Sequence, residues 1–205
     1  MSDANWLWPI DGKSFYDINN NNYLVHIDWS KNSKEDYQKL SQDFFECGYK
    51  ICEKIVDSGH DNIKSDMWFF PTMYLFRHGM ELGLKALICG AISEKRKIQQ
   101  IFLDCKHDLY MLFDAYERET AILLTEEEYG WMKKYLHSLE EVDAKSDFFR
   151  FPLEDEFLLN YQNKFLDIVD MANSMLQAYG IIQKCLEIQE ENRIDRFDAL
   201  RSSVF

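Results

Sequence analysis

Four side chains able to do acid–base or ion-binding chemistry recur on one predicted helix that is otherwise apolar. Arg77, Glu81 and Lys85 are spaced by four residues, and His78 lies three residues before Glu81. All four therefore share one helix face. Charges on a buried helix must be paired or must line a cavity, because an unpaired buried charge is very costly. Two interpretations follow: a structural ion-pair network, or a pocket in which Arg77 or Lys85 holds a phosphate and His78 moves protons.

Two further places carry similar chemistry. His107 and Asp108 open the next long helix, where they act either as cap residues or as groups facing the first stripe. Arg150 lies among aromatic residues in a loop, where it either anchors the loop to a carboxylate or reaches the same pocket. The catalytic candidates are His78 and His107, and the binding candidates are Arg77, Glu81, Lys85, Asp108 and Arg150.

The remaining motif classes indicate neither a metal nor a cofactor. No zinc-ligand spacing occurs, and the Glu-x-x-His pairs of di-iron bundles are missing. No glycine-rich phosphate loop is present. The five cysteines are odd in number and lack a CxxC pair. Four of them lie in apolar helical stretches, which favours a reducing, cytoplasmic environment.

Composition limits the partners. The 205 residues contain 36 acidic and 23 basic side chains, for a net charge of −13. Nucleic-acid affinity comes largely from phosphate neutralisation, so we expect no broad affinity for DNA, RNA or an anionic membrane without a local basic pocket. No apolar run is long enough to span a bilayer. With only 8 Gly and 3 Pro, the chain favours long helices over a β-sandwich.

The pattern of apolar residues predicts an all-α, up-and-down bundle of about five helices over residues 33–190. The expected helices run from Ser33 to Gly59, from Pro71 to about Ile92, from His107 to about Glu119, from Thr125 to about Val142 and from Pro152 to about Gln189. Residues 94–103 form a short basic and apolar segment of one or two helical turns.

Both ends of the chain differ from the bundle. Residues 1–32 form an aromatic-rich arm expected to pack on the body or on a partner. Within it, the alternation in Tyr23–Trp29 predicts a short strand. Residues 191–205 form a polar tail, expected to be disordered or bound to a partner.

Three short motifs in this chain resemble those of HEPN (higher eukaryotes and prokaryotes nucleotide-binding) domains. Tyr74–Leu87 is similar to their "hxxElxLKalL" helix, and His107–Leu112 to the "HdLxxL" start of their next helix. Phe149–Pro152 is similar to an "FRYP" loop of related bacterial proteins. The resemblance spans Phe70–Pro152, less than half of the chain.

The resemblance implies an all-α bundle, often a symmetric homodimer, of bacterial toxin–antitoxin and phage-defence systems. Many such proteins are metal-independent RNases with an Arg-x4–6-His site. This chain departs from that site, because Arg77 and His78 are adjacent and Arg96 lies too far before His107. We therefore expect a HEPN-like protein that binds a nucleotide, RNA or a cognate protein without cleaving RNA. The alternatives are a divergent metal-independent ribonuclease, in which His78 or His107 is the general base, and a structural scaffold built on a buried ion-pair network.

Overall fold

The computed structural model describes residues 29–59, 61–120, 124–143, 146, 149–150 and 166–202. Within these ranges every regular element is an α-helix. The six helices are α1 (Ser33–Val56), α2 (Asn62–Ala91), α3 (Lys95–Cys105), α4 (Leu109–Glu119), α5 (Glu126–Asp143) and α7 (Ile168–Ser202). The all-α bundle is thus confirmed for the described part of the chain. The strand predicted at Tyr23–Trp29 is unsupported: Trp29 is not in a strand, and residues 23–28 lie outside these ranges.

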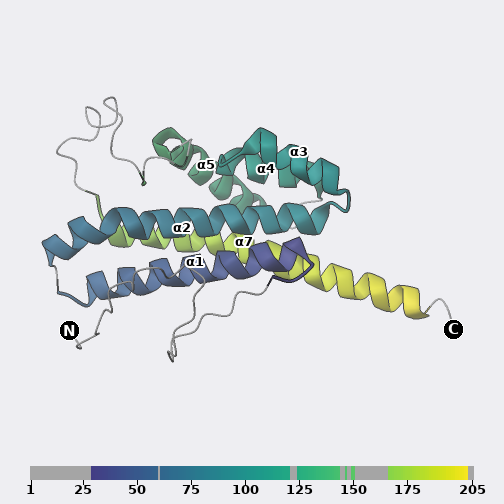
Figure 1. Ribbon diagram of the computed structural model, residues 1–205, viewed down its shortest axis with the longest axis horizontal. Helices are drawn as coiled ribbons and strands as arrows, with labels where there is room; N and C mark the ends of the chain where they lie inside the picture. The colour runs from purple at the N-terminus through teal and green to yellow at the C-terminus, as the bar shows by residue number, and fades with distance from the viewer. Residues whose placement is uncertain are drawn as a thin grey trace, which may run out of the picture.

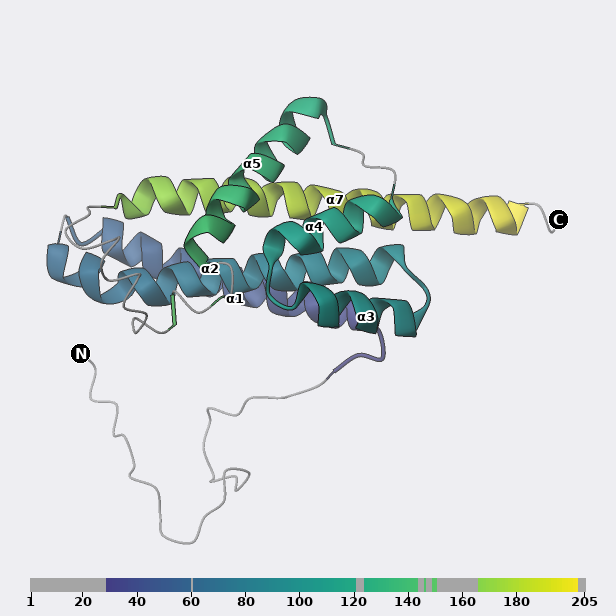
Figure 2. The ribbon, with the colours of Figure 1, turned by 90° about the horizontal axis from the view of Figure 1, so that it is seen from above.

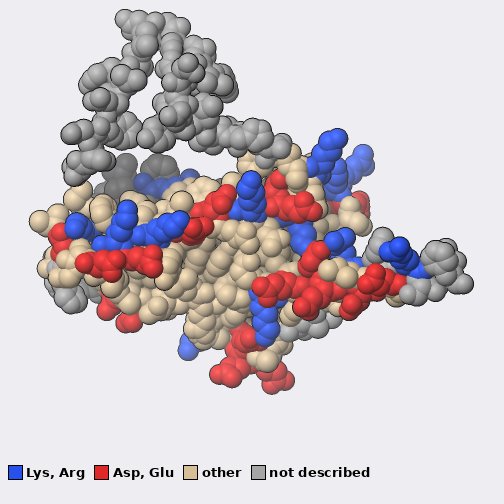
Figure 3. All heavy atoms as spheres, turned by 90° about the horizontal axis from the view of Figure 1, so that it is seen from below, with Lys and Arg blue, Asp and Glu red and all other residues tan. Residues whose placement is uncertain are grey.

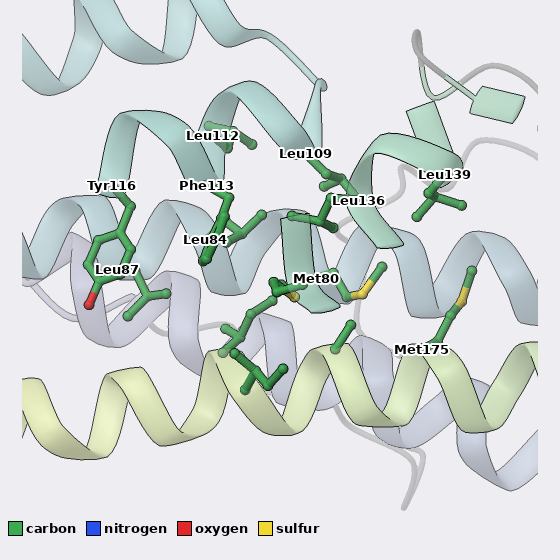
Figure 4. Close-up of a cluster of buried hydrophobic side chains, with 14 of the residues drawn as sticks. Met80, Leu84, Leu87, Leu109, Leu112, Phe113, Tyr116, Leu136, Leu139 and Met175 are labelled. Carbon is green, nitrogen blue, oxygen red and sulfur yellow. The ribbon is translucent and has the colours of Figure 1, made fainter. Parts of the chain in front are cut away.

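Helix α2 is the central element of the bundle. Figure 1 shows α1 and α7 along one side of it and the shorter α3, α4 and α5 along the other, and Figure 2 shows the same arrangement from above. Its side chains form most of the middle of the core. Figure 4 shows Leu84 and Leu87 of α2 beside Phe113 and Tyr116 of α4, with Met175 of α7 in the same cluster. Full burial of each such side chain contributes about 1.5–3 kcal/mol.

Two glycines let neighbouring helices approach α2 closely. A Cβ on Gly79 would lie 3.1 Å from the main-chain oxygen of Ser41, and one on Gly83 would lie 2.8 Å from Ile182 Cγ2. The hydroxyl of Ser41 donates a hydrogen bond to the main-chain oxygen of Gly79 at 2.6 Å. Close packing at these points joins α1 and α7 to the helix that carries the polar stripe.

The prediction that the second helix begins at Pro71 is wrong. Helix α2 begins nine residues earlier, at Asn62, and Pro71 lies inside it. The carboxylate of Asp61 caps the helix by accepting hydrogen bonds from the backbone N–H groups of Ile63 and Lys64. A proline within a helix leaves one carbonyl without its intrahelical partner. That cost is offset here by a strong cap and by the packing of the apolar residues that follow.

Most of the other predicted helix ends agree with the structure. Gly59 adopts a φ of 68° after α1, as expected of a left-handed cap. Thr125 and Glu128 form the expected capping box, with the backbone N–H of each bonded to the side chain of the other. Residues 95–105 form a helix of their own, α3, which brings the number above the five expected. Its partly buried side chains, such as Phe102, pack on the core and stabilise it.

The C-terminal helix also differs from the prediction. The polar segment expected to be a separate tail from residue 191 is helical to Ser202, as the continuation of α7. The expected start of that helix, near Pro152, lies outside the described residues. Within them, α7 begins at Ile168. None of the described helices is both long enough and apolar enough to cross a membrane.

Candidate functional site

Arg77 lies at the centre of the polar contacts and is completely enclosed, with 0% of its surface exposed. Its Nε lies 2.7 Å from Oδ2 of Asp143, at the end of α5. Its Nη2 donates to the main-chain oxygens of His107 at 2.7 Å and of Asp143 at 3.0 Å. One guanidinium thus joins α2, the turn before α4 and the end of α5. A ligand could contact Arg77 only by displacing these groups.

Glu140, one turn before the end of α5, is the second acid near Arg77. Its Oε1 accepts a hydrogen bond from the backbone N–H of Leu109 at 2.9 Å and lies 3.9 Å from Nη2 of Arg77. Burial raises the pKa of Glu140 to about 7, although the Leu109 bond and Arg77 oppose the shift. We call Arg77, Glu140 and Asp143 the inner cluster.

Glu81 lies between this inner cluster and the surface. One carboxylate oxygen, Oε1, contacts Nζ of Lys85 at 2.6 Å and Nδ1 of His107 at 3.0 Å. The other, Oε2, lies 3.5 Å from Nη1 of Arg77 and 3.9 Å from Nδ1 of His78. Burial alone would raise the pKa of Glu81, but the surrounding His78, Lys85 and His107 outweigh it and lower the pKa to about 2. Glu81 is therefore a buried carboxylate that stays ionised.

The groups on the outer side of Glu81 reach solvent. The side chain of His107 is 52% exposed, and that of His78 is 25% exposed. His78 stacks on Tyr74 with ring centroids 5.5 Å apart and meets the edge of Phe44 from α1 at 4.6 Å. The guanidinium of Arg150 lies 5.9 Å from the centroid of Tyr74, and this arginine is exposed.

We call His78, Lys85, His107 and Arg150 the outer cluster. The ammonium of Lys85 lies 5.6 Å from the ring centroid of Phe102, so an aromatic side chain supports each end of this cluster. His78, Lys85 and His107 converge on the single carboxylate of Glu81, and Arg150 adds a second fixed cation beside Tyr74. Such a surface can bind an anionic group, and its aromatic side chains can stack on a planar one.

Asp108 does not take part in this arrangement. Its carboxylate accepts a hydrogen bond from the backbone N–H of Met111 at 2.7 Å, and it is the N-cap of α4. It therefore supports the position of His107, the residue before it, and points its charge at its own helix. Of the seven predicted site residues, the structure brings His78, Glu81, Lys85 and His107 together, links Arg150 through Tyr74, encloses Arg77 and turns Asp108 away.

Five side chains at this site were missed from the sequence: Phe44, Tyr74, Phe102, Glu140 and Asp143. A signal for the two acids was present, because acidic side chains at a helix C-terminus oppose the helix dipole and need a cation nearby. No comparable signal marks Phe44, which reaches His78 through the packing of α1 on α2.

A cavity of about 260 Å³ lies elsewhere, between α5 and α7. Its lining includes Tyr135, Leu139 and Met175, and none of the predicted site residues borders it. In the described residues no group of three or more His, Cys, Asp or Glu side chains is placed to hold a metal ion. The groups that the structure places around Glu81 are ion-pairing side chains, imidazoles and aromatic rings.

A buried anchor with a solvent-facing set of cations and imidazoles is compatible with ligand binding and with proton transfer. Comparison of the chain with protein-family models, curated proteins and solved structures gives no match in any of the three.

Proposed function

We propose that this chain is an intracellular bacterial HEPN-like protein that binds a nucleotide or RNA through the outer cluster, without cleaving it, and that it acts as a homodimer in a toxin–antitoxin or phage-defence system. The observation that carries the proposal is the convergence of His78, Lys85 and His107 on Glu81. Around one buried carboxylate stand several groups that can carry positive charge, and they reach the surface of a chain whose net charge is −13.

The aromatic neighbours favour a ligand with a planar part. Tyr74 contacts both the ring of His78 and the guanidinium of Arg150, and an exposed arginine beside a stacked aromatic pair can hold both a phosphate and a base. Because the rest of the surface is acidic, we expect few phosphate contacts. The dependence of affinity on salt is then shallow, with a slope on a log–log plot of about −0.7 per phosphate neutralised.

The position of Arg77 supports binding over catalysis. An arginine that stabilises a reacting phosphate must be able to touch it. Arg77, the arginine next to His78, is instead held by Asp143 and by main-chain oxygens in the core. Its contacts hold Glu81 and the main chain of His107 in place beneath the outer cluster.

The test is a binding measurement with two probes, a fluorescein-labelled mixed-sequence RNA oligonucleotide followed by anisotropy and ATP followed by calorimetry. Arg150→Ala should weaken the affinity for at least one probe by about tenfold, the loss of one charge-assisted contact. The matched control is Arg118→Ala, which removes an exposed arginine of α4 that pairs only with Asp114 at 3.6 Å among the described residues. No binding of either probe by the unmodified protein would reject this function.

A divergent ribonuclease is the second candidate, and the pair formed by His107 and Glu81 favours it. The carboxylate holds Nδ1 of His107 at 3.0 Å, so Nε2 is the nitrogen left to take a proton from a ribose 2′-hydroxyl. Cleavage of a labelled RNA pool in the presence of a chelator, lost in His107→Ala but kept in His137→Ala, would replace the binding proposal with this one. If the chain neither binds nor cleaves RNA or nucleotides, the scaffold alternative gains support.

A further inference from the structure

One face of the molecule, away from the outer cluster, lacks charged side chains along α7. From Met171 to Gln183 the helix carries no acidic or basic residue. Within and just before this run, a stripe at alternating four- and three-residue steps is at least partly exposed: Val169, Asn173, Leu176, Gly180 and Gln183. This is the spacing by which one helix packs along another in a coiled coil.

Helix α1 carries a second uncharged stripe with the same spacing: Gln38, Gln42, Phe45, Tyr49 and Cys52. Phe45 and Cys52 are buried against the core, and the other three reach the surface. The two stripes adjoin. Phe45 stacks on Tyr179 of α7 with ring centroids 3.8 Å apart, and the hydroxyls of Ser41 and Tyr179 lie within 3.4 Å. Figure 3 shows the result, a broad uncharged area in the middle of this face with acidic and basic side chains around it. We call it the α1/α7 face.

This face has the character of an interface. Tyr49 is 43% exposed and Val169 is 41% exposed, although both are large and apolar. Gly180, at the middle of the α7 stripe, has no atom of another described element within 4 Å of its Cβ position. A side chain from a partner helix can therefore approach the α7 backbone there.

We infer that the α1/α7 face binds a second copy of this chain. Two molecules with a net charge of −13 repel each other, so they can associate closely only through surfaces that bring no further like charges together. The amides of Gln38, Gln42 and Asn173 both donate and accept hydrogen bonds, so each can pair with an identical group. A two-fold interface must be self-complementary in this way, because the same patch lies on both sides.

This inference rests on the homodimer part of the proposed function and adds which surface forms it. The test is the molar mass of the full chain by light scattering after gel filtration, over a hundredfold range of concentration. The variant is Gly180→Glu, which puts a carboxylate in the middle of the face. The matched control is Gly130→Glu in α5, where the glycine is also helical and exposed and its Cβ position is open.

We expect a dimer for the unmodified chain and for Gly130→Glu, and at least a tenfold weaker dimer for Gly180→Glu with unchanged helical circular dichroism. Gly180→Ala, which adds no charge, should stay dimeric. A Gly180→Glu protein that dimerises as tightly as Gly130→Glu would overturn the choice of face and leave the homodimer in place. A monomeric unmodified chain would overturn both, without affecting nucleotide or RNA binding at the outer cluster.

Discussion

The inner and outer clusters belong to one continuous set of polar contacts, yet they differ in what surrounds them. Arg77 in the inner cluster is completely buried and contacts Glu81 of α2, the turn before α4 and the end of α5. His107 in the outer cluster touches Glu81 with one nitrogen and is half open to water. The difference teaches that groups of one polar network can differ widely in their access to water, according to what packs over them.

The balance of charges also separates the groups that neutralise one another from those that stay open to solvent. At a pH below 7 the raised pKa of Glu140 keeps it protonated, so Arg77 and Lys85 face the two carboxylates of Glu81 and Asp143. These four charges then balance, with Lys85 of the outer cluster neutralising Glu81. The groups that can carry charge and remain open to solvent are then His78, His107 and Arg150.

The largest expected effect comes from removing the centre of the inner cluster. Arg77→Met removes the guanidinium that contacts both Asp143 and Glu81 in the core, which should lower the free energy of unfolding by about 3–5 kcal/mol. Urea denaturation followed by circular dichroism measures it, with Arg118→Met as a control that should change little. A loss below about 1 kcal/mol would mean that the inner cluster is not what holds α5 on α2.

A smaller effect is expected at the residue that joins the two clusters. Glu81→Gln keeps the shape but weakens the contacts to Lys85 and His107, so we expect a loss of about 1–3 kcal/mol by the same measurement. Ligand affinity should change as well, since the outer cluster loses its anchor. If the variant had unchanged stability and unchanged affinity, Glu81 would contribute to neither cluster.

Next in size is a pH dependence that belongs to Glu140. Its pKa is raised in the folded state, so between about pH 4.5 and 7 the folded protein holds a proton that the unfolded chain has lost. Stability should fall as the pH rises through this window, by about 1–2 kcal/mol once partial solvent access is allowed for. The lowered pKa of Glu81 acts in a different window, since its contribution is lost as the pH falls from about 4.5 to 2.

The measurement is urea denaturation at several pH values from 4.5 to 8. Glu140→Gln should flatten the decline between pH 4.5 and 7, because the amide does not titrate. Glu141→Gln, at the exposed neighbouring position, is the control and should keep the decline. If both variants follow the unmodified protein, another group is responsible.

The smallest effect on stability is expected in the outer cluster. Arg150→Ala should lower the free energy of unfolding by about 0.5–1.5 kcal/mol, because it removes a partly buried hydrogen bond, from its Nε to the main-chain oxygen of Ser146. Its effect should appear in ligand affinity instead. A loss of stability like that of Arg77→Met would show that Arg150 belongs with the inner cluster.

The spacing of residues in the sequence predicted the features that depend on neighbouring residues, namely helices, caps and contacts one turn apart. The helical periodicity and the caps indicated most of the helices, and the four-residue steps brought Arg77, Glu81 and Lys85 into contact, because residues one turn apart always share a face. The start of α2 was misplaced because a proline suggested a boundary that the Asp61 cap and the packing of the following turns override.

Burial is what the tertiary structure decided. Arg77 and Lys85 are alike in sequence, but only Arg77 meets Asp143, 66 residues away, and only the fold could place that residue. His107 reaches Glu81 across 26 residues for the same reason. A helix pattern sets which side chains point the same way, whereas the elements packed over them set which remain in water.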